Sequence, residues 1–152
     1  MKVKEFIKNN FFFMLMVAFC IIFMFNFRII QVSGNSMDTT LADKEFHFAK
    51  LNQEIKRNDI IVANSEVLNC VIIKRVIGMP GDTIEIKDNV LYVNDEAVVE
   101  NYIKEEMVTN DLGPYTLQDN EYFACGDNRN HSTDSRVLGP ISEEDIIGVM
   151  LF

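Results

Sequence analysis

The N-terminal part of the chain is one long apolar run. Residues 11–25 contain no charged side chain, and the run continues to Ile30 with only Asn26 and Arg28 interrupting it. Counted from residue 11 to residue 30 it has about 20 residues, the length of a membrane-spanning helix. No cleavage site of small residues follows it, which favours a retained anchor over a cleaved secretory signal peptide.

The residues before this run are basic. Lys2, Lys4 and Lys8 precede it, whereas only Arg28 lies near its far end. By the positive-inside rule, this asymmetry places the N-terminus in the cytoplasm. We therefore expect residues 1–30 to form a basic cytoplasmic tip and a single transmembrane anchor in the cell membrane. Residues 31–152 would then form an extracytoplasmic domain.

Beyond the apolar run, short segments alternate between apolar and polar residues, as β-strands do. An extended segment at 29–32 leads into the domain, and the turn Asp88-Asn89 joins a hairpin. Residues 100–120 are polar and irregular, so we expect a loop or a short hairpin there. The sequence therefore predicts a mainly β domain on one N-terminal helix. Its main strands are expected at residues 46–49, 60–63, 71–77, 83–87, 90–93, 122–125 and 148–152.

Charge and composition exclude several classes of protein. The formal charge of the chain is −9 although residues 1–30 are basic, so the expected outer domain is strongly acidic. An acidic domain gives no support for binding nucleic acid phosphates. Three cysteines without a CxxC spacing and two scattered histidines give no disulfide framework and no metal site. We expect no metal, no cofactor and no nucleic acid partner.

A lysine lies inside the most apolar predicted strand. Alternation places Lys74 on one face with Ile72 and Val76, and Arg75 on the other face. One of the two cations must therefore lie on the buried face of the strand. Burial of a lysine lowers its pKa, because it penalises the charged form. The alternative is a lysine at the sheet edge whose amine reaches solvent.

Two polar segments contain side chains that could act together with such an amine. Ser36 lies on a small, flexible turn two residues after Gly34, where a backbone can approach a ligand closely, although an ordinary turn serine would look the same. A second segment, 126–136, follows a predicted strand and is dense in charged side chains. Such clustering is typical of hydrogen-bonded networks that hold catalytic groups. Its charged members are Asp127, Arg129, Asp134 and Arg136.

Three segments together resemble the motifs of bacterial type I signal peptidases, which are membrane-anchored serine proteases with a Ser/Lys dyad. Residues 33–41, Ser-Gly-Asn-Ser-Met-Asp-Thr-Thr-Leu, resemble the nucleophile motif. Residues 74–82, Lys-Arg-Val-Ile-Gly-Met-Pro-Gly-Asp, resemble the general-base motif, and residues 126–136 resemble the distal structural motif. The order of the motifs and the apolar N-terminus also match those of the family, so the similarity covers essentially the whole chain.

The resemblance implies a signal-peptidase-like β catalytic domain that removes signal peptides from exported preproteins after a small-x-small sequence. Ser36 would be the nucleophile, and Lys74 would be the general base. The backbone N–H of Ser36 would donate to the oxyanion. Ser132 would orient the lysine amine, and Asp134 and Arg136 would form a supporting ion pair.

The resemblance also implies a binding site for the preprotein, which would add to the domain as a β-strand. Some relatives carry a second oxyanion hydroxyl at the position of Gly34, where this chain has none. Shallow apolar pockets would bind the small residues before the cut, although the residues expected in them could equally be core. By motif position these pocket residues are Val32, Leu41, Ile72 and Ile73.

Two features depart from the family pattern, and two other function classes stay open. The family usually has proline at the position of Thr39 and often has glycine at the position of Asn58. Some relatives lack the dyad and assist the assembly of surface proteins or pilins without cleaving, but this chain keeps both Ser36 and Lys74. Self-cleaving repressors share the Ser/Lys chemistry, but carry a DNA-binding domain where this chain has its apolar run.

Overall fold

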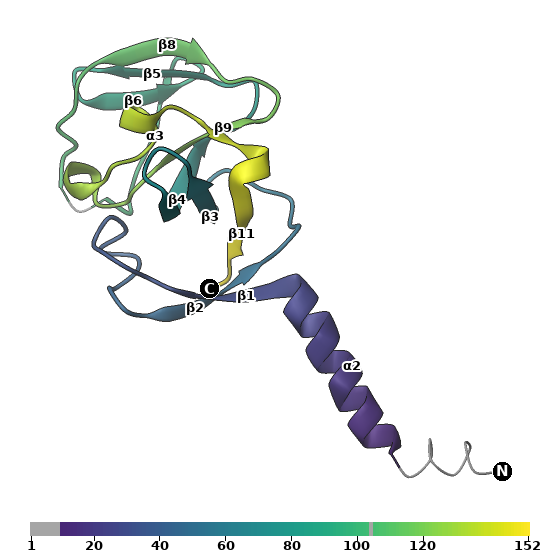
Figure 1. Ribbon diagram of the computed structural model, residues 1–152. Coiled ribbons are helices and arrows are strands. Elements are labelled where there is room, and N and C mark those ends of the chain that lie inside the picture. The colour runs from purple at the N-terminus through teal and green to yellow at the C-terminus, as the bar shows by residue number, and fades with distance from the viewer. Residues whose placement is uncertain (1–9, 104) are drawn as a thin grey trace.

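The computed structural model describes residues 10–103 and 105–152 and shows a helix projecting from a β domain (Figure 1). Helix α2, Phe11–Asn26, is apolar on every side, and none of its side chains is buried. Within residues 10–103 and 105–152, no helix combines the length and hydropathy needed to cross a membrane. The basic residues Lys2, Lys4 and Lys8, on which the predicted orientation rests, lie outside the described residues.

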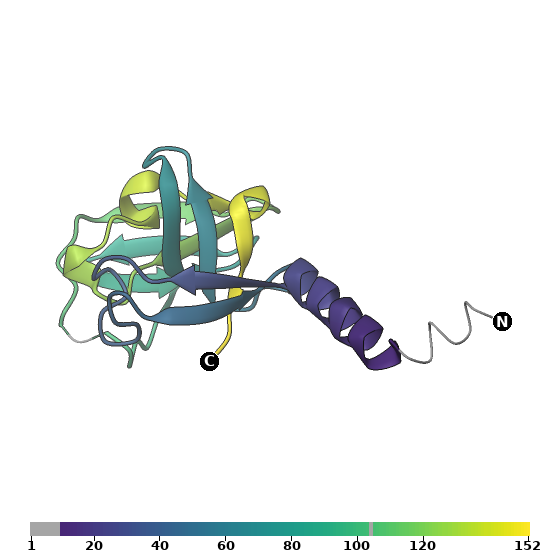
Figure 2. The same ribbon diagram turned by 60° about the horizontal axis from the view of Figure 1, so that its bottom comes forward.

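The helix is shorter than the sequence predicts. It ends at Asn26, and strand β1, Phe27–Gln31, begins at the next residue, so a helix over residues 27–30 is wrong. The physical reason is pairing, because β1 lies antiparallel to β2, Phe46–Lys50, with Ile30 opposite His47. In the turned view of Figure 2, β1 continues directly from the end of α2 along the β domain.

The domain consists of two sheets. The larger sheet has the strand order β1-β2-β11-β3-β4-β9-β10, and the smaller has the order β7-β6-β5-β8. The other strands of the larger sheet are β3, Ile60–Ser65; β4, Cys70–Gly78; β9, Glu121–Cys125; β10, Ile141–Ser142; and β11, Ile146–Met150. The smaller sheet contains β5, Thr83–Lys87; β6, Val90–Val93; β7, Glu96–Ala97; and β8, Leu112–Thr116.

The mainly β fold and its main strands are therefore confirmed. The difference lies in the segment predicted as irregular, 100–120, which contains β8 beside β5. The closing strand, predicted over 148–152, runs from Ile146 to Met150 instead. The short helix α3, Ser135–Leu138, follows β9 and the one-turn 3-10 helix Arg129–His131.

Strand β4 is buried from Ile72 to Gly78 on one face and half-buried at Ile73 and Arg75 on the other, which explains its largely apolar sequence. At its C-terminal end, Ile77 packs with Phe123 of β9 against Ile84 of the smaller sheet. A second cluster contains Ile72 and other residues of β3, β4 and β9. A third cluster surrounds Met37, in the segment between β1 and β2, so the core reaches the loop that carries Ser36.

Candidate active site

The core holds the loop that carries Ser36. The neighbouring Met37 is almost completely buried, and its carbonyl accepts a hydrogen bond from the Leu41 N–H at 2.9 Å. Gly34 takes φ +91°, a left-handed conformation that favours glycine, and its N–H donates to Asp43 Oδ1 at 2.9 Å. The half-buried Ser36 is therefore presented on a turn whose two flanks are fixed.

Strand β4 brings Lys74 to this hydroxyl. The lysine is only 4% exposed, and its Nζ lies 2.9 Å from Ser36 Oγ and donates to the carbonyl of Ile73 at 2.9 Å. Burial lowers the pKa of Lys74, and the nearby Asp134 carboxylate opposes this shift without cancelling it. A hydroxyl beside a lysine with a lowered pKa has the arrangement of a nucleophile with its base.

The segment after β9 closes the site from the other side. Strand β9 ends at Cys125, opposite Arg75 of β4, so the residues that follow reach the Ser36 loop. The Asn128 N–H donates to the Ser36 carbonyl at 3.0 Å. A Cβ on Gly126 would lie 2.4 Å from that same carbonyl oxygen and 2.3 Å from Ser132 Oγ. Only glycine allows this close approach.

The other residues expected to support the site lie beside this segment. Ser132 Oγ is buried and has no partner of full hydrogen-bond geometry among the described residues, but it lies close enough to Asp134 to help lower the pKa of that carboxylate. Its expected role in orienting the lysine amine stays a prediction. Asp134 accepts from Arg136 Nε and from the Gly126 N–H, at 2.8 and 2.9 Å. Burial raises the pKa of Asp134, but hydrogen bonds and charge from Arg136 outweigh it, so the net shift is downward.

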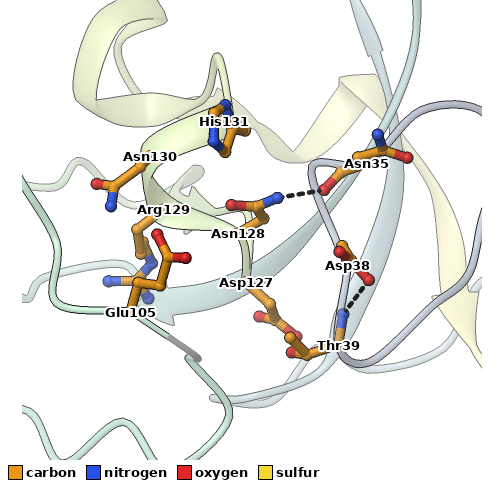
Figure 3. Close-up of a pocket in the computed structure, with 9 residues that line it drawn as sticks. All are labelled: Asn35, Asp38, Thr39, Glu105, Asp127, Asn128, Arg129, Asn130 and His131. Carbon is orange, nitrogen blue, oxygen red and sulfur yellow. Dashed lines mark hydrogen bonds between the residues drawn. The ribbon is translucent and has the colours of Figure 1, made fainter.

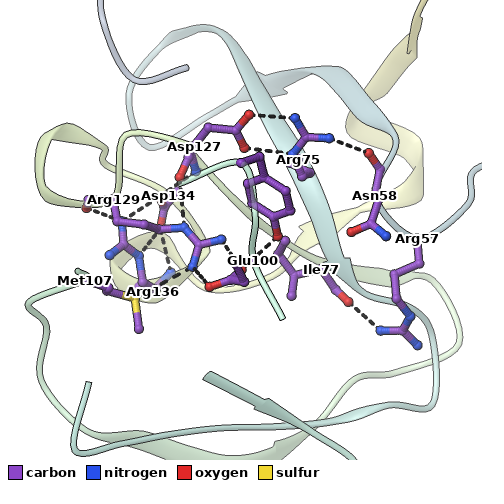
Figure 4. Close-up of polar contacts among 12 residues, drawn as sticks. Arg57, Asn58, Arg75, Ile77, Glu100, Met107, Asp127, Arg129, Asp134 and Arg136 are labelled. Atoms are coloured by element: carbon purple, nitrogen blue, oxygen red, sulfur yellow. Dashed lines mark hydrogen bonds and ion pairs between the residues drawn. The ribbon is translucent and has the colours of Figure 1, made fainter. Parts of the chain in front are cut away.

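A second ion pair joins β4 to the segment after β9 (Figure 4). Arg75 donates to both carboxylate oxygens of Asp127, at 2.8 and 2.6 Å. The Thr40 hydroxyl donates to the same carboxylate at 2.5 Å, which brings in the nucleophile loop. The Arg75 guanidinium also stacks 4.3 Å from the centre of the Tyr102 ring.

A third ion pair lies deeper in the domain, and no motif in the sequence predicts it. Arg129 pairs with Glu100, which also accepts from the Tyr102 hydroxyl at 2.8 Å. Glu100 and Tyr102 belong to the segment predicted as irregular, where no motif marks them. The four charged side chains singled out in residues 126–136 do belong to a polar network, but two of them take partners from outside that segment.

An apolar groove runs beside Ser36 and Lys74. It is lined by residues 30–34 and 70–73 together with Ser36, Met37 and Lys74, and its volume is about 350 Å³. Three expected pocket residues, Val32, Ile72 and Ile73, line it, and so does Gly34. Leu41 does not line this groove but is buried in the core with Met37.

The chain is similar to known proteins along almost its whole length. A family model described as signal peptidase, peptidase S26, matches residues 3–152. The chain is 38% identical to signal peptidase I P of Bacillus subtilis subsp. natto, over 89% of this chain and 82% of that protein. It is 34% identical to signal peptidase I of Streptococcus pneumoniae serotype 4, over 81% of this chain and 79% of that protein.

One solved structure supports the same relationship. The crystal structure of a signal peptidase I from Enterococcus faecalis V583 matches with a TM-score of 0.57 and 31% identity. The match covers 65% of this chain and 98% of that one.

The lowered pKa of Lys74 predicts how stability depends on pH. The unfolded chain holds this proton up to the usual lysine pKa of 10.5, whereas the folded chain releases it at lower pH. Between the two values unfolding takes up a proton, so the free energy of unfolding rises with pH. We expect urea denaturation of wild type and Lys74→Met to give a stability difference that shifts in favour of wild type as the pH rises towards the usual lysine pKa of 10.5.

The variant Lys87→Met, which removes an exposed lysine, provides the control. Its free energy of unfolding should follow that of wild type across the same pH range. A difference between wild type and Lys74→Met that stays constant with pH would show that Lys74 titrates alike in both states.

Proposed function

The chain belongs to the signal peptidase family, peptidase S26, and we propose that it cuts signal peptides from exported preproteins with Ser36 as nucleophile and Lys74 as general base. The observation that carries this proposal is the 2.9 Å distance between Lys74 Nζ and Ser36 Oγ, with the lysine buried. A protonated lysine cannot accept a proton, so the chemistry needs the lowered pKa that burial provides.

Each step uses an atom of this chain. The neutral Lys74 amine takes the Ser36 proton as Oγ attacks the scissile carbonyl, and then returns it to the departing amine. Among the described residues nothing accepts a hydrogen bond from the Ser36 N–H, so this donor is free for the oxyanion. The same lysine then activates the water that hydrolyses the acyl-enzyme. Gly34 has no hydroxyl, so it supplies no side-chain donor to the oxyanion.

The groove beside the dyad gives this reaction its substrate preference. Ile72 and Ile73 line the groove next to Ser36, and a shallow apolar site of this kind suits small side chains in an extended chain. Substrate that lies between residues 70–74 of β4, which β9 leaves unpaired, and the segment before Ser36 can exchange backbone hydrogen bonds with that segment. We propose that Val32, Ile72 and Ile73 line the pockets for the small residues before the cut, and that Leu41 supports them from the core.

We also propose that α2 attaches the enzyme to the cell membrane, with the β domain on the outer side. Its exposed side chains are large and apolar, among them Phe12 and Phe25, and a surface of that kind is unfavourable in water. The helix projects away from the β domain, so lipid can surround it (Figure 1). Attachment of this kind keeps the site close to membrane-inserted signal peptides.

The dyad is tested by cleavage of a detergent-solubilised preprotein, with the cut site read by mass spectrometry. We expect wild type to cut after a small-x-small sequence. Loss of a general base costs about 10²–10⁴-fold in rate, so Lys74→Ala should be slowed at least that much, and Ser36→Ala should not cut. If wild type cuts none of several preproteins, the chain is better described as a non-cleaving assembly partner for surface proteins or pilins.

The pH dependence of cleavage provides a separate test of the base. The rate should rise with pH as Lys74 deprotonates, with a midpoint below the usual lysine pKa of 10.5. Because the Asp134 carboxylate raises the pKa of Lys74, Asp134→Asn should move the midpoint to lower pH. Initial rates from acid to alkaline pH measure both midpoints. A flat profile for wild type contradicts a lysine base.

Membrane attachment through α2 is tested by washing membranes with alkaline carbonate. Wild type should stay with the lipid. Aspartate in an apolar helix centre costs about 2.5–3.5 kcal/mol, so the double variant Phe19→Asp, Ile22→Asp should appear in the supernatant. Val137→Asp, which adds a charge to an exposed position of α3, should remain with the membrane. If the double variant stays in the membrane fraction as completely as wild type, α2 does not attach the protein to the membrane.

A further inference from the structure

A second cavity lies next to the nucleophile loop, and the dyad chemistry leaves it unused (Figure 3). Its volume is about 590 Å³, and it shares no lining residue with the apolar groove. The groove takes residues 30–34, Ser36 and Met37 from the nucleophile loop and residues 70–74 from β4, whereas this cavity takes Asn35, Asp38 and Thr39 from the loop. A polypeptide that lies in the groove with its scissile carbonyl at Ser36 must continue past that residue. The cavity offers the space for the continuation.

The buried charges around this cavity are already paired. Asp127 is held by Arg75, and Arg129 is held by Glu100, so neither pair attracts a charged ligand strongly. The side chain of Asn130 accepts from the Val108 N–H and donates to the Glu106 carbonyl. These groups build the wall of the cavity rather than its binding surface.

Among the remaining lining residues, Thr39 and Asn128 donate to the carbonyls of Tyr102 and Asn35, and two other side chains, Asp38 and Glu105, are acidic. Asp38 uses one carboxylate oxygen to accept from the Thr39 N–H at 2.8 Å, which leaves the other oxygen open. No residue in 10–103 or 105–152 pairs with the Glu105 carboxylate or with the His131 ring. In Figure 3 the residues of the Ser36 loop and those of the 127–131 segment face each other across the space.

We propose that this cavity binds the first residues that follow the scissile bond and prefers a basic side chain among them. The inference rests on the proposed peptidase function and adds a specificity site for the mature end of the substrate. An extended chain rises about 3.3 Å per residue, so the first three residues after the bond span the region next to Ser36. A lysine or arginine there can approach Asp38 or Glu105, whereas a glutamate is repelled.

The experiment compares peptides that share one cut site and differ only in carrying lysine, glutamine or glutamate at the first, second or third position after it. Exposed charge pairs are weak, so we expect the lysine peptide to exceed the glutamate peptide by about two- to fivefold in kcat/KM at low salt. Higher salt should reduce the ratio, because it screens exposed charges. The variants Asp38→Asn and Glu105→Gln should each lower it, and together they should bring it close to one.

Two controls separate this inference from the dyad assignment. Glu144→Gln removes an exposed charge that does not line the cavity and should keep the wild-type ratio. Binding of the same peptides to Ser36→Ala, followed by fluorescence anisotropy, should give the same order of affinity without any chemistry. If the peptides bind in that order, the result supports a preference for basic residues in the cavity even if cleavage fails and the dyad assignment is wrong. The inference is overturned if kcat/KM for the lysine and glutamate peptides is equal at every position. It is also overturned if their ratio is the same in wild type and in the Asp38→Asn, Glu105→Gln double variant.

Discussion

The buried carboxylate of Asp127 joins the two segments on which the site depends. Arg75, which holds it through two hydrogen bonds, directly follows the candidate base in β4. Thr40, which donates to it at 2.5 Å, belongs to the loop of the candidate nucleophile. Because the carboxylate is only 1% exposed, losing a partner would leave a buried charge, at a cost of about 3–5 kcal/mol. One side chain therefore fixes strand and loop together, and with them the distance from Lys74 to Ser36.

A neutral lysine needs more than burial, because a free carboxylate nearby would hold the proton on it. Asp134 is the carboxylate that raises the pKa of Lys74 most, and it lies in the same buried region. Arg136 engages both of its oxygens, at 2.8 Å each, and its own charge lowers the pKa of Lys74. The ion pair therefore lets a carboxylate anchor the Gly126 backbone, while the charge of Arg136 opposes the stabilisation that Asp134 gives to a charged amine.

The sequence predicts the parts of this arrangement that are local. Alternation in β4 separates Lys74 from Arg75, the first motif carries Ser36, and the third motif carries Gly126 and Asp134. What it does not predict is pairing between distant segments. Glu100 and Tyr102 come from a stretch without periodicity, and only the folded chain brings them to Arg129 and Arg75. The end of α2 was missed for the same reason, because strand pairing overrides the apolar pattern of residues 27–30.

The departure at Thr39 shows how the nucleophile loop is held. Thr39 takes φ +94°, whereas proline is confined to about −65°, so the usual proline of the family does not fit this backbone. A β-branched residue is strained at positive φ, at a cost of about 1–3 kcal/mol. Thr39 meets this cost with contacts that proline lacks, since its N–H donates to Asp38 and its hydroxyl donates to the Tyr102 carbonyl at 2.9 Å. The loop is therefore fixed by tertiary hydrogen bonds instead of a locked dihedral, and its geometry depends on the segment that also carries Glu100.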